Sequence, residues 1–262
     1  MKKLSLALMF SFGGAAFAQT PAANMMPDGS RDMYAGLGVG SAPLCDGSDE
    51  RKTRLVPNIQ VQWSNGIFLK NASLGMHLSD RPGIEYGPIL EYERGCDASP
   101  SRKLEGARDI DASLGVGVFF NYYPVNNLRL SSRLLVGTES ERRRVLLSLD
   151  AKKYMQIAPH HGVAVSFGLS WANQAYAQTR LEFEPLRAYF ANAPAAVQKT
   201  GYSTHSGVKD VHAGVNWNWE LNPSWLVTSQ ASIYRLTGSV ADNPLNNRRS
   251  YMTVYTGLAY RF

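Results

Sequence analysis

The chain has 262 residues, and its 27 lysines and arginines against 21 aspartates and glutamates give a formal charge of +6. This mild excess is far from the basic stripe of a nucleic-acid-binding protein, so nucleic acid is not an expected partner. Only two cysteines are present, without C-x-x-C or Cys/His zinc spacing, so we expect neither a metal nor another cofactor. No Pro/Ser-rich linker divides the chain, which suffices for one large domain.

The first residues have the layout of a secretory signal peptide. Lys2 and Lys3 precede a short apolar run, Leu4–Phe12, and Ala16-Phe17-Ala18 fits the small-x-small cleavage rule. We therefore expect residues 1–18 to be removed, which leaves 25 basic against 21 acidic residues and a charge of +4. The apolar run is too short for a membrane-spanning helix, which needs about 20 residues.

After this leader, apolar residues alternate with polar or small ones, which is the pattern of β-strands. The expected strands are often about eleven to fourteen residues long, where strands usually have about 5–6. The alternation is clearest in five segments: Asp111–Tyr123, Leu128–Gly137, Val163–Ala172, Val208–Leu221 and Met252–Phe262. Aromatic residues gather towards the ends of the apolar faces: Tyr122, Trp171, Trp217, Trp219, Trp225, Tyr260 and Phe262.

Such strands fit a membrane better than water, because their apolar faces end in aromatic residues and their opposite faces mix charge with glycine. Lipid cannot satisfy an open sheet edge, so the strands must close into a barrel. We predict an all-β fold over residues 31–262, a transmembrane antiparallel β-barrel in the outer membrane of a Gram-negative cell. Residues 19–30 would form a periplasmic N-terminal segment. The alternative is a soluble, secreted sandwich.

The connections between the strands differ in length, which predicts the orientation of the barrel. Three short turns are assigned to the periplasm: Pro124–Asn127, Ala158–His161 and Asn222–Ser224. Three longer polar connections are assigned to the external side: Thr138–Arg144, Gln174–Ser206 and Ser239–Arg249. Both chain ends then lie in the periplasm, which requires an even number of strands. One strand over Gly66–Leu78 would give eleven, so we divide it near Lys70-Asn71-Ala72 and predict about twelve strands.

The same count places both cysteines on the external side. Cys45 falls in the connection Ala42–Lys52, and Cys96 falls in Gly95–Asp109. An even pair of cysteines in an oxidising compartment is most simply one disulfide, so we predict a Cys45–Cys96 bond.

The chain ends with Leu258, Tyr260 and Phe262 on one face of the last expected strand. A terminal phenylalanine preceded by alternating apolar residues looks like the sorting signal read by the outer-membrane insertion machinery, which is therefore an expected partner. The last strand would also pair with the first and close the barrel.

Charged residues follow two patterns. One group lies in or beside the expected external loops and would be either solvated or in contact with lipopolysaccharide phosphates, since arginine pairs bidentately with phosphate: Arg142, Arg143, Arg144, Arg248 and Arg249. Outer-membrane lipid and lipopolysaccharide are thus expected partners. The second group mixes both signs on inward faces: Arg129, Arg133, Asp150, Lys152, Asp210 and Glu220. These would either pair and plug the lumen or line a narrow path for solutes.

Other candidate motifs are weak. The spaced glycines of Tyr34–Ser41 lack the helix that would follow a phosphate-binding loop, so we interpret them as small inward residues. His160-His161 and His212 lack further ligands for a metal. Thr204-His205-Ser206 lacks a legible orienting acid and oxyanion donor, so no catalytic residue is expected.

Short motifs in the second half of the chain occur in a familiar order: Lys209-Asp210, Leu221–Trp225, Tyr234–Gly238, Ala241–Pro244 and Gly257–Phe262. This ordered set resembles the MipA/OmpV family of outer-membrane proteins, and upstream segments such as Arg108–Pro124 are similar to it as well. Tyr189–Ala193 matches the family's middle loop only loosely.

The resemblance implies a monomeric, non-enzymatic barrel of the cell envelope. In one branch of the family the protein is a scaffold that joins a lytic transglycosylase to a murein synthase. A narrow porin-like channel for small solutes is the alternative function, and an outer-membrane lipid-modifying enzyme is the third.

Overall fold

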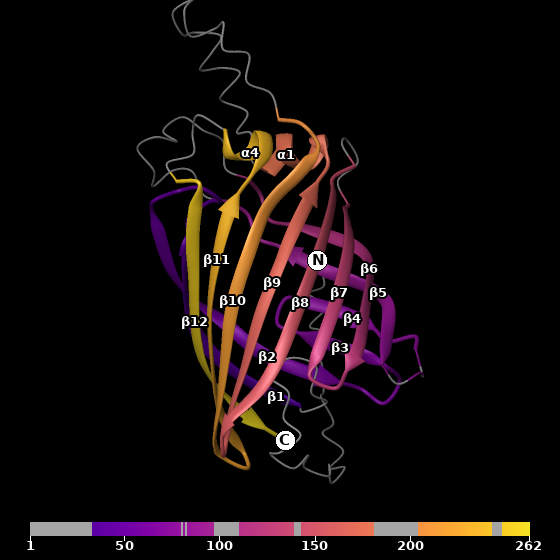
Figure 1. Cartoon of the computed structure of the whole chain (residues 1–262), viewed down its shortest axis with the longest axis vertical. Helices are drawn as coiled ribbons and strands as arrows, with labels where there is room; N and C mark the ends of the chain where they lie inside the picture. Colours follow the sequence, from indigo (N-terminus) through magenta and orange to yellow (C-terminus); the bar gives the residue numbers. More distant parts are fainter. Residues whose placement is uncertain are drawn as a thin grey trace, which may run out of the picture.

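The computed structural model describes residues 33–79, 81, 83–96, 110–138, 143–180, 204–242 and 248–262. Over these residues the chain forms an antiparallel barrel of twelve strands that is closed by pairing of the first strand with the last (Figure 1). The predicted fold class and strand number are therefore confirmed. The expected leader, the segment 19–30, Arg142 and Tyr189–Ala193 lie outside the described residues.

Each strand pairs with its neighbours in the sequence. The strands are β1 (Tyr34–Pro43), β2 (Arg51–Gln62), β3 (Ile67–Lys70), β4 (Ser73–Met76), β5 (Ile84–Glu93), β6 (Ser113–Val125), β7 (Leu128–Gly137), β8 (Val145–Ala158), β9 (His161–Ala172), β10 (Gly207–Asn222), β11 (Trp225–Leu236) and β12 (Ser250–Arg261). Two short helices, α1 (Gln174–Arg180) and α4 (Gly238–Ala241), lie at the end that carries the long connections (Figure 1). Within the described ranges, no helix is long and apolar enough to cross a membrane.

The outer surface of the barrel is apolar, as the alternation predicts. Five large side chains of β6 expose 43–55% of their surface: Leu114, Val116, Val118, Phe120 and Tyr122. Phe119, which points inward among them, exposes 7%. Removing a large apolar side chain from water is worth about 1.5–3 kcal/mol, so such a belt is stable only when lipid covers it.

Aromatic rings gather on this outer surface at the end with the short turns, which is the periplasmic end. His161, Trp217 and Trp219 form a cluster in which every pair of ring centroids is 5.7–6.0 Å apart. Trp217 Nε1 donates a hydrogen bond to His161 Nδ1 at 3.2 Å. Trp225 packs edge-on against Tyr260 at 5.3 Å. Rings with one polar atom suit the interface between hydrocarbon and water, so this belt marks the inner boundary of the membrane.

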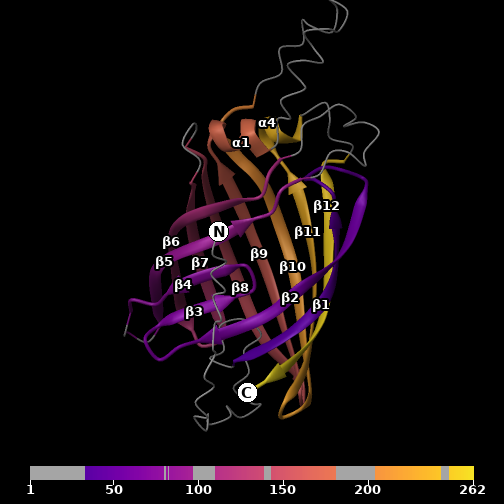
Figure 2. The ribbon, with the colours of Figure 1, turned by 180° about the vertical axis from the view of Figure 1, so that it is seen from behind.

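The hairpin predicted between Gly66 and Leu78 is present and very short. β3 and β4 have four residues each, and the turn between them places Asn71 at a positive φ of 49°. Asn71 also completes the edge of β2, because its N–H donates to the Ile59 carbonyl at 2.8 Å and its Oδ1 accepts from the Ile59 N–H at 3.1 Å. Figure 2 shows the pair between β2 and β5.

The short hairpin leaves part of β2 paired on one side only. β2 pairs with β1 from Arg51 to Gln60, but with β3 only from Gln60 to Gln62. Alternate residues of a strand direct their backbone N–H and C=O groups to the same side. Ile59 directs these groups towards the hairpin, so Pro57, two residues earlier, faces the same side at a point where no strand pairs with it. Proline has no N–H to leave without a partner, which is why it is tolerated at such an edge.

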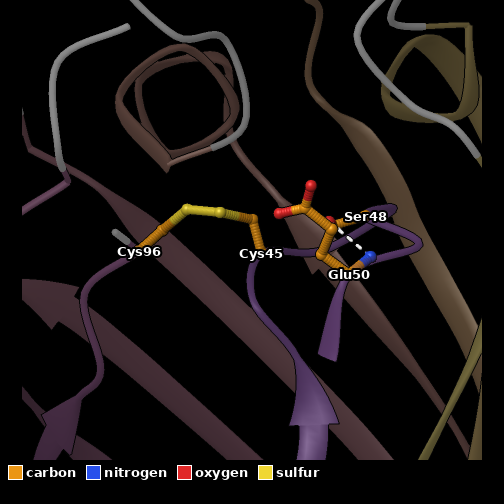
Figure 3. The surroundings of a disulfide bond; sticks show 4 residues. All are labelled: Cys45, Ser48, Glu50 and Cys96. Atoms are coloured by element: carbon orange, nitrogen blue, oxygen red, sulfur yellow. Dashed lines mark hydrogen bonds between the residues drawn. A yellow bond between two sulfur atoms is a disulfide. The ribbon is translucent and has the colours of Figure 1, made fainter. Parts of the chain in front are cut away.

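A disulfide joins Cys45 to Cys96, with Cα atoms 5.3 Å apart (Figure 3). Cys45 follows β1, and Cys96 follows β5 and pairs with Ile110 through two backbone hydrogen bonds of 2.8 Å. The bond thus connects the outer ends of β1 and β5 at a level that β3 and β4 do not reach. It closes a loop of 51 residues, which restricts the unfolded chain as well.

The closing seam between β1 and β12 depends on glycine. An ideal Cβ on Gly36 would lie 2.0 Å from the Leu258 carbonyl oxygen, and one on Gly38 would lie 2.5 Å from the Tyr255 ring. Leu37 and Val39 between them face outward and are exposed. The glycines therefore lie on the lumen side, where they let the two strands approach and leave room for the Tyr255 ring.

We expect Gly36→Ala to destabilise the barrel by about 1–3 kcal/mol, because the added methyl group overpacks the seam. Gly40→Ala is the matched control on the same strand, since its nearest atom would be 3.6 Å away. The measurement is the unfolding temperature of the two variants in detergent, followed by the change in gel mobility on heating. Equal unfolding temperatures would contradict this account of the seam.

Candidate functional site in the barrel lumen

The middle of the barrel contains a polar cavity of about 430 Å3. Its charged lining comes from five strands, β3, β5, β7, β8 and β10, because inward positions of the strands converge on one space. The charged side chains and the histidine that line it are Lys70, Glu85, Arg129, Arg133, Asp150, Lys152 and His212. Side chains above and below the cavity fill the two ends of the lumen.

The external end of the lumen is filled by a series of ionic contacts. Lys209 Nζ lies 2.8 Å from Asp46 and 3.4 Å from Asp210, and the Tyr251 hydroxyl donates to Asp46 at 2.9 Å. Asp46 directly follows Cys45, so the connection after β1 folds into the opening of the barrel. Tyr234 stacks on Tyr251 with ring centroids 5.0 Å apart.

His212 continues this series of ionic contacts from Asp210 down to the cavity. Its Nδ1 lies 2.9 Å from Asp210 and its Nε2 lies 2.9 Å from Asp150. A carboxylate only accepts hydrogen bonds, so both ring nitrogens can donate at once only in the charged imidazolium form. The strand between them, β9, has no room for a side chain at this point. Gly168 pairs with both Asp150 and His212, and a Cβ on it would lie 2.5 Å from both side chains.

The periplasmic end is filled by a buried ion pair. Arg261 Nη1 lies 2.9 Å from Glu220, and the two side chains expose only 3% and 5% of their surface. His160 contacts the same carboxylate at 3.2 Å from the turn between β8 and β9. Nearby, Asn58 Nδ2 donates to Thr228 Oγ1 at 2.9 Å, and both side chains are buried.

The cavity between these ends is rich in cations. Arg129 of β7 and Lys152 of β8 stand directly opposite each other in the strand register. Arg133, four residues further along β7, donates to Glu91. The Glu85 carboxylate accepts from Asn121 Nδ2 at 3.1 Å and from the Tyr123 hydroxyl at 2.9 Å.

The inward charged residues named from the sequence were expected either to pair and plug the lumen or to line a path for solutes. In the structure they divide between paired positions and positions that line the cavity. Glu220 and Asp210 belong to ionic contacts that fill the ends of the lumen. Arg129, Arg133 and Lys152 line the cavity between the ends, and Asp150 lines it while contacting His212. Sequence reasoning missed Asp46, because nothing in the pattern shows that its loop folds inward.

One predicted lipopolysaccharide contact is wrong. Arg144 exposes only 1% of its surface, and its guanidinium donates to Ser113 Oγ at 2.9 Å and lies 3.4 Å from Glu93. Even-numbered residues of β8 point inward, and Arg144 extends that series just before the strand. Arg143, Arg248 and Arg249 are exposed, and Arg249 forms a surface ion pair with Asp242 at 2.9 Å.

The described part of the chain contains no cluster of three His, Cys, Asp or Glu residues that could hold a metal ion. Ser206 Oγ accepts from the Gln174 N–H, so it belongs to the cap of α1. Ser170 and His212 both contact Asp210 Oδ1, at 3.2 Å and 2.9 Å, and are thereby held by the acid. These contacts are structural, and they do not arrange a serine for attack by a histidine base.

A closed twelve-stranded barrel with an apolar belt, an aromatic boundary and a polar lumen defines an outer-membrane β-barrel protein, and the chain resides in the Gram-negative outer membrane. The model of the family described as MltA-interacting protein MipA matches residues 35–262. The chain belongs to this family, as the resemblance implies.

Solved structures with a similar fold are outer-membrane barrels. The NanC porin has a TM-score of 0.50 at 10% identity, covering 88% of this chain and 100% of that one. A bacterial polysaccharide outer membrane secretin has a TM-score of 0.49 at 10% identity, covering 89% and 99%. An outer membrane channel from Pseudomonas putida F1 has a TM-score of 0.44 at 10% identity, covering 89% and 96%. The search of curated proteins finds no match.

Removing one partner of the buried Arg261–Glu220 pair leaves an uncompensated charge. We expect Arg261→Met to lower the free energy of unfolding by about 3–5 kcal/mol, and the double variant with Glu220→Gln to regain part of that loss. Arg249→Met is the control, because its ion pair with Asp242 is exposed and worth about 0–1 kcal/mol. Denaturant unfolding in detergent measures these three variants and the single variant Glu220→Gln. A double variant that loses the sum of both single losses would show that the two side chains act independently.

Proposed function

We propose that this chain is a non-enzymatic, monomeric scaffold of the outer membrane that holds a lytic transglycosylase, and with it a murein synthase, at the periplasmic side. The observation that carries the proposal is the family match over residues 35–262, since the family's description names interaction with MltA. The ionic contacts at both ends of the lumen support it, because a scaffold does not need an open pore.

The periplasmic side offers a surface for such a partner. The hairpins β8–β9 and β10–β11 reach furthest at that end (Figure 1). His160 lies at the tip of the first with a positive φ of 63°, and its side chain is exposed although it contacts Glu220. The nearby stacked rings of Trp217 and Trp219 lie on the lipid-facing side of the same hairpins.

Site-specific photo-crosslinking in intact cells tests the scaffold. A photoreactive residue at His160 is expected to capture a murein synthase or lytic transglycosylase, whereas the same residue at Arg249, on the external side, is not. Capture at neither position, together with discrete conductance steps in planar bilayers, would overturn the scaffold in favour of the second candidate. That candidate is a narrow channel for small solutes, and the central cavity of about 430 Å3 favours it.

The C-terminal face carries a second part of the proposal. Leu258, Tyr260 and Phe262 all face lipid, and we assign them to the signal read by the insertion machinery. Phe262→Ser is expected to reduce the outer-membrane yield several-fold, with the protein lost to periplasmic degradation. Met252→Ser is the control, because it also replaces a large exposed apolar side chain by serine, on the same face of β12 but away from the end. Quantitative immunoblots of membrane fractions measure both, and equal yields would remove the assignment.

The exposed arginines remain proposed contacts for lipopolysaccharide phosphates. Arg143, Arg248 and Arg249 lie at the external end, where the phosphate groups of the outer leaflet would meet them. Unchanged co-purification of lipopolysaccharide with the variant that carries serine at all three positions would remove this part of the proposal.

A further inference from the structure

The connection between β1 and β2, Leu44–Glu50, is more buried than an ordinary surface loop. Leu44 and Cys45 expose only 5% and 9% of their surface. The two ends of the connection are joined, because the Leu44 N–H donates to the Glu50 carbonyl at 2.8 Å. Figure 3 shows a second bond within it, from the Glu50 N–H to the Ser48 hydroxyl at 3.1 Å. The connection is therefore an ordered turn that packs against the rest of the protein.

This connection is attached to the external rim of the barrel on two sides. On one side, Cys45 is bonded to Cys96, which follows β5. On the other side, Asp46 contacts Lys209 of β10 at 2.8 Å and Tyr251 of β12 at 2.9 Å. In the closed sheet, β5 lies four strands from β1 in one direction, and β10 lies three strands from β1 in the other. A segment tied to β1, β5 and β10 lies across the opening of a barrel of twelve strands.

The two attachments differ in kind. The disulfide beside β5 is covalent, and such bonds persist in an oxidising compartment. The attachment on the other side consists of non-covalent contacts: those of the Asp46 carboxylate and a backbone hydrogen bond of 3.1 Å from the Arg248 N–H to the Gly47 carbonyl. Contacts of this second kind break and re-form. The connection is therefore arranged to detach from the β10 side while it stays bonded beside β5.

The groups that contact Asp46 have further support from the barrel. Tyr251 stacks on Tyr234 with ring centroids 5.0 Å apart, and it packs against an apolar cluster of α1, β11 and α4. This cluster consists of Ala177, Leu236, Val240 and Ala241. Lys209 Nζ also lies 3.4 Å from Asp210. Without Asp46, Lys209 would thus keep a carboxylate beside it, and this side of the rim would keep its packing.

From Lys209, the ionic contacts described above lead inward to the central cavity. We infer that Leu44–Glu50 is a hinged plug, which closes the external end of the lumen and controls access to the central cavity from that side. The disulfide is the hinge of the plug, and the Asp46 carboxylate is its latch, held by Lys209 and Tyr251. The plug is independent of the scaffold, so a negative crosslinking result at the periplasmic end leaves it standing.

Thiol accessibility in the full-length mature barrel in detergent tests the plug. Ser148→Cys places a reporter thiol on β8, in the lining of the central cavity. Mass spectrometry follows the rate at which a water-soluble maleimide modifies this thiol, and slow modification is expected while the plug is intact. Asp46→Ala is expected to raise the rate about tenfold or more, because the loss of a hydrogen bond to a charged group shifts the equilibrium between closed and open forms by such a factor.

Asp242→Ala is the matched control, because it makes the same change at the external end, where the ion pair of Asp242 with Arg249 is exposed. It is expected to leave the rate unchanged. Tyr251→Phe is the second latch variant and decides the test if Asp46→Ala does not fold: it keeps the ring and removes the hydroxyl that donates to Asp46, for an increase of about threefold or more. Rates in the folded latch variants equal to those of the reporter alone or of the control would overturn the plug.

Discussion

In hydrocarbon every backbone N–H and C=O group needs a partner within the protein, and the rest of this structure depends on that constraint. It requires β1 to meet β12, which Gly36 permits because it carries no side chain against the Leu258 carbonyl. It also governs the weakest part of the wall, where β3 and β4 are too short to cover β2. There the chain places Pro57 on the unpaired edge and ties β1 to β5 through Cys45 and Cys96.

Closure with twelve strands creates an interior that must be filled by the inward residues, which alternate with outward ones along every strand. Those residues are polar, because the same alternation gives the apolar ones to lipid. Polar groups in a poorly solvated interior need partners, so both ends of the lumen contain ion pairs. This pairing restricts which residues the sequence can use: Gly168 has no side chain, so Asp150 and His212 can meet across it.

Much of this follows from the sequence, because strand parity is a local property. The outward series of β6 and the inward Arg129, Arg133 and Lys152 could be named from alternation alone, and the even strand count located the Asn71 hairpin. What could not be read is the register between strands, which decides that Arg129 faces Lys152 and that Glu220 meets Arg261. Arg144 was misplaced for a related reason: its position in a polar run suggested a loop, but it continues the inward parity of β8.

The lumen is not filled in the way that stability alone would select. Its two ends join opposite charges, as a plug should, whereas its middle sets Arg129 against Lys152 and leaves an open volume. A purely structural core could replace either side chain by a neutral polar residue and relieve the repulsion. The ionic chain from Asp46 through Lys209, Asp210 and His212 to Asp150 also ends at this cavity, beside Lys152. The middle and the ends of the lumen therefore differ in how charge is arranged: opposite charges meet at the ends, and the middle places Arg129 opposite Lys152 in the strand register.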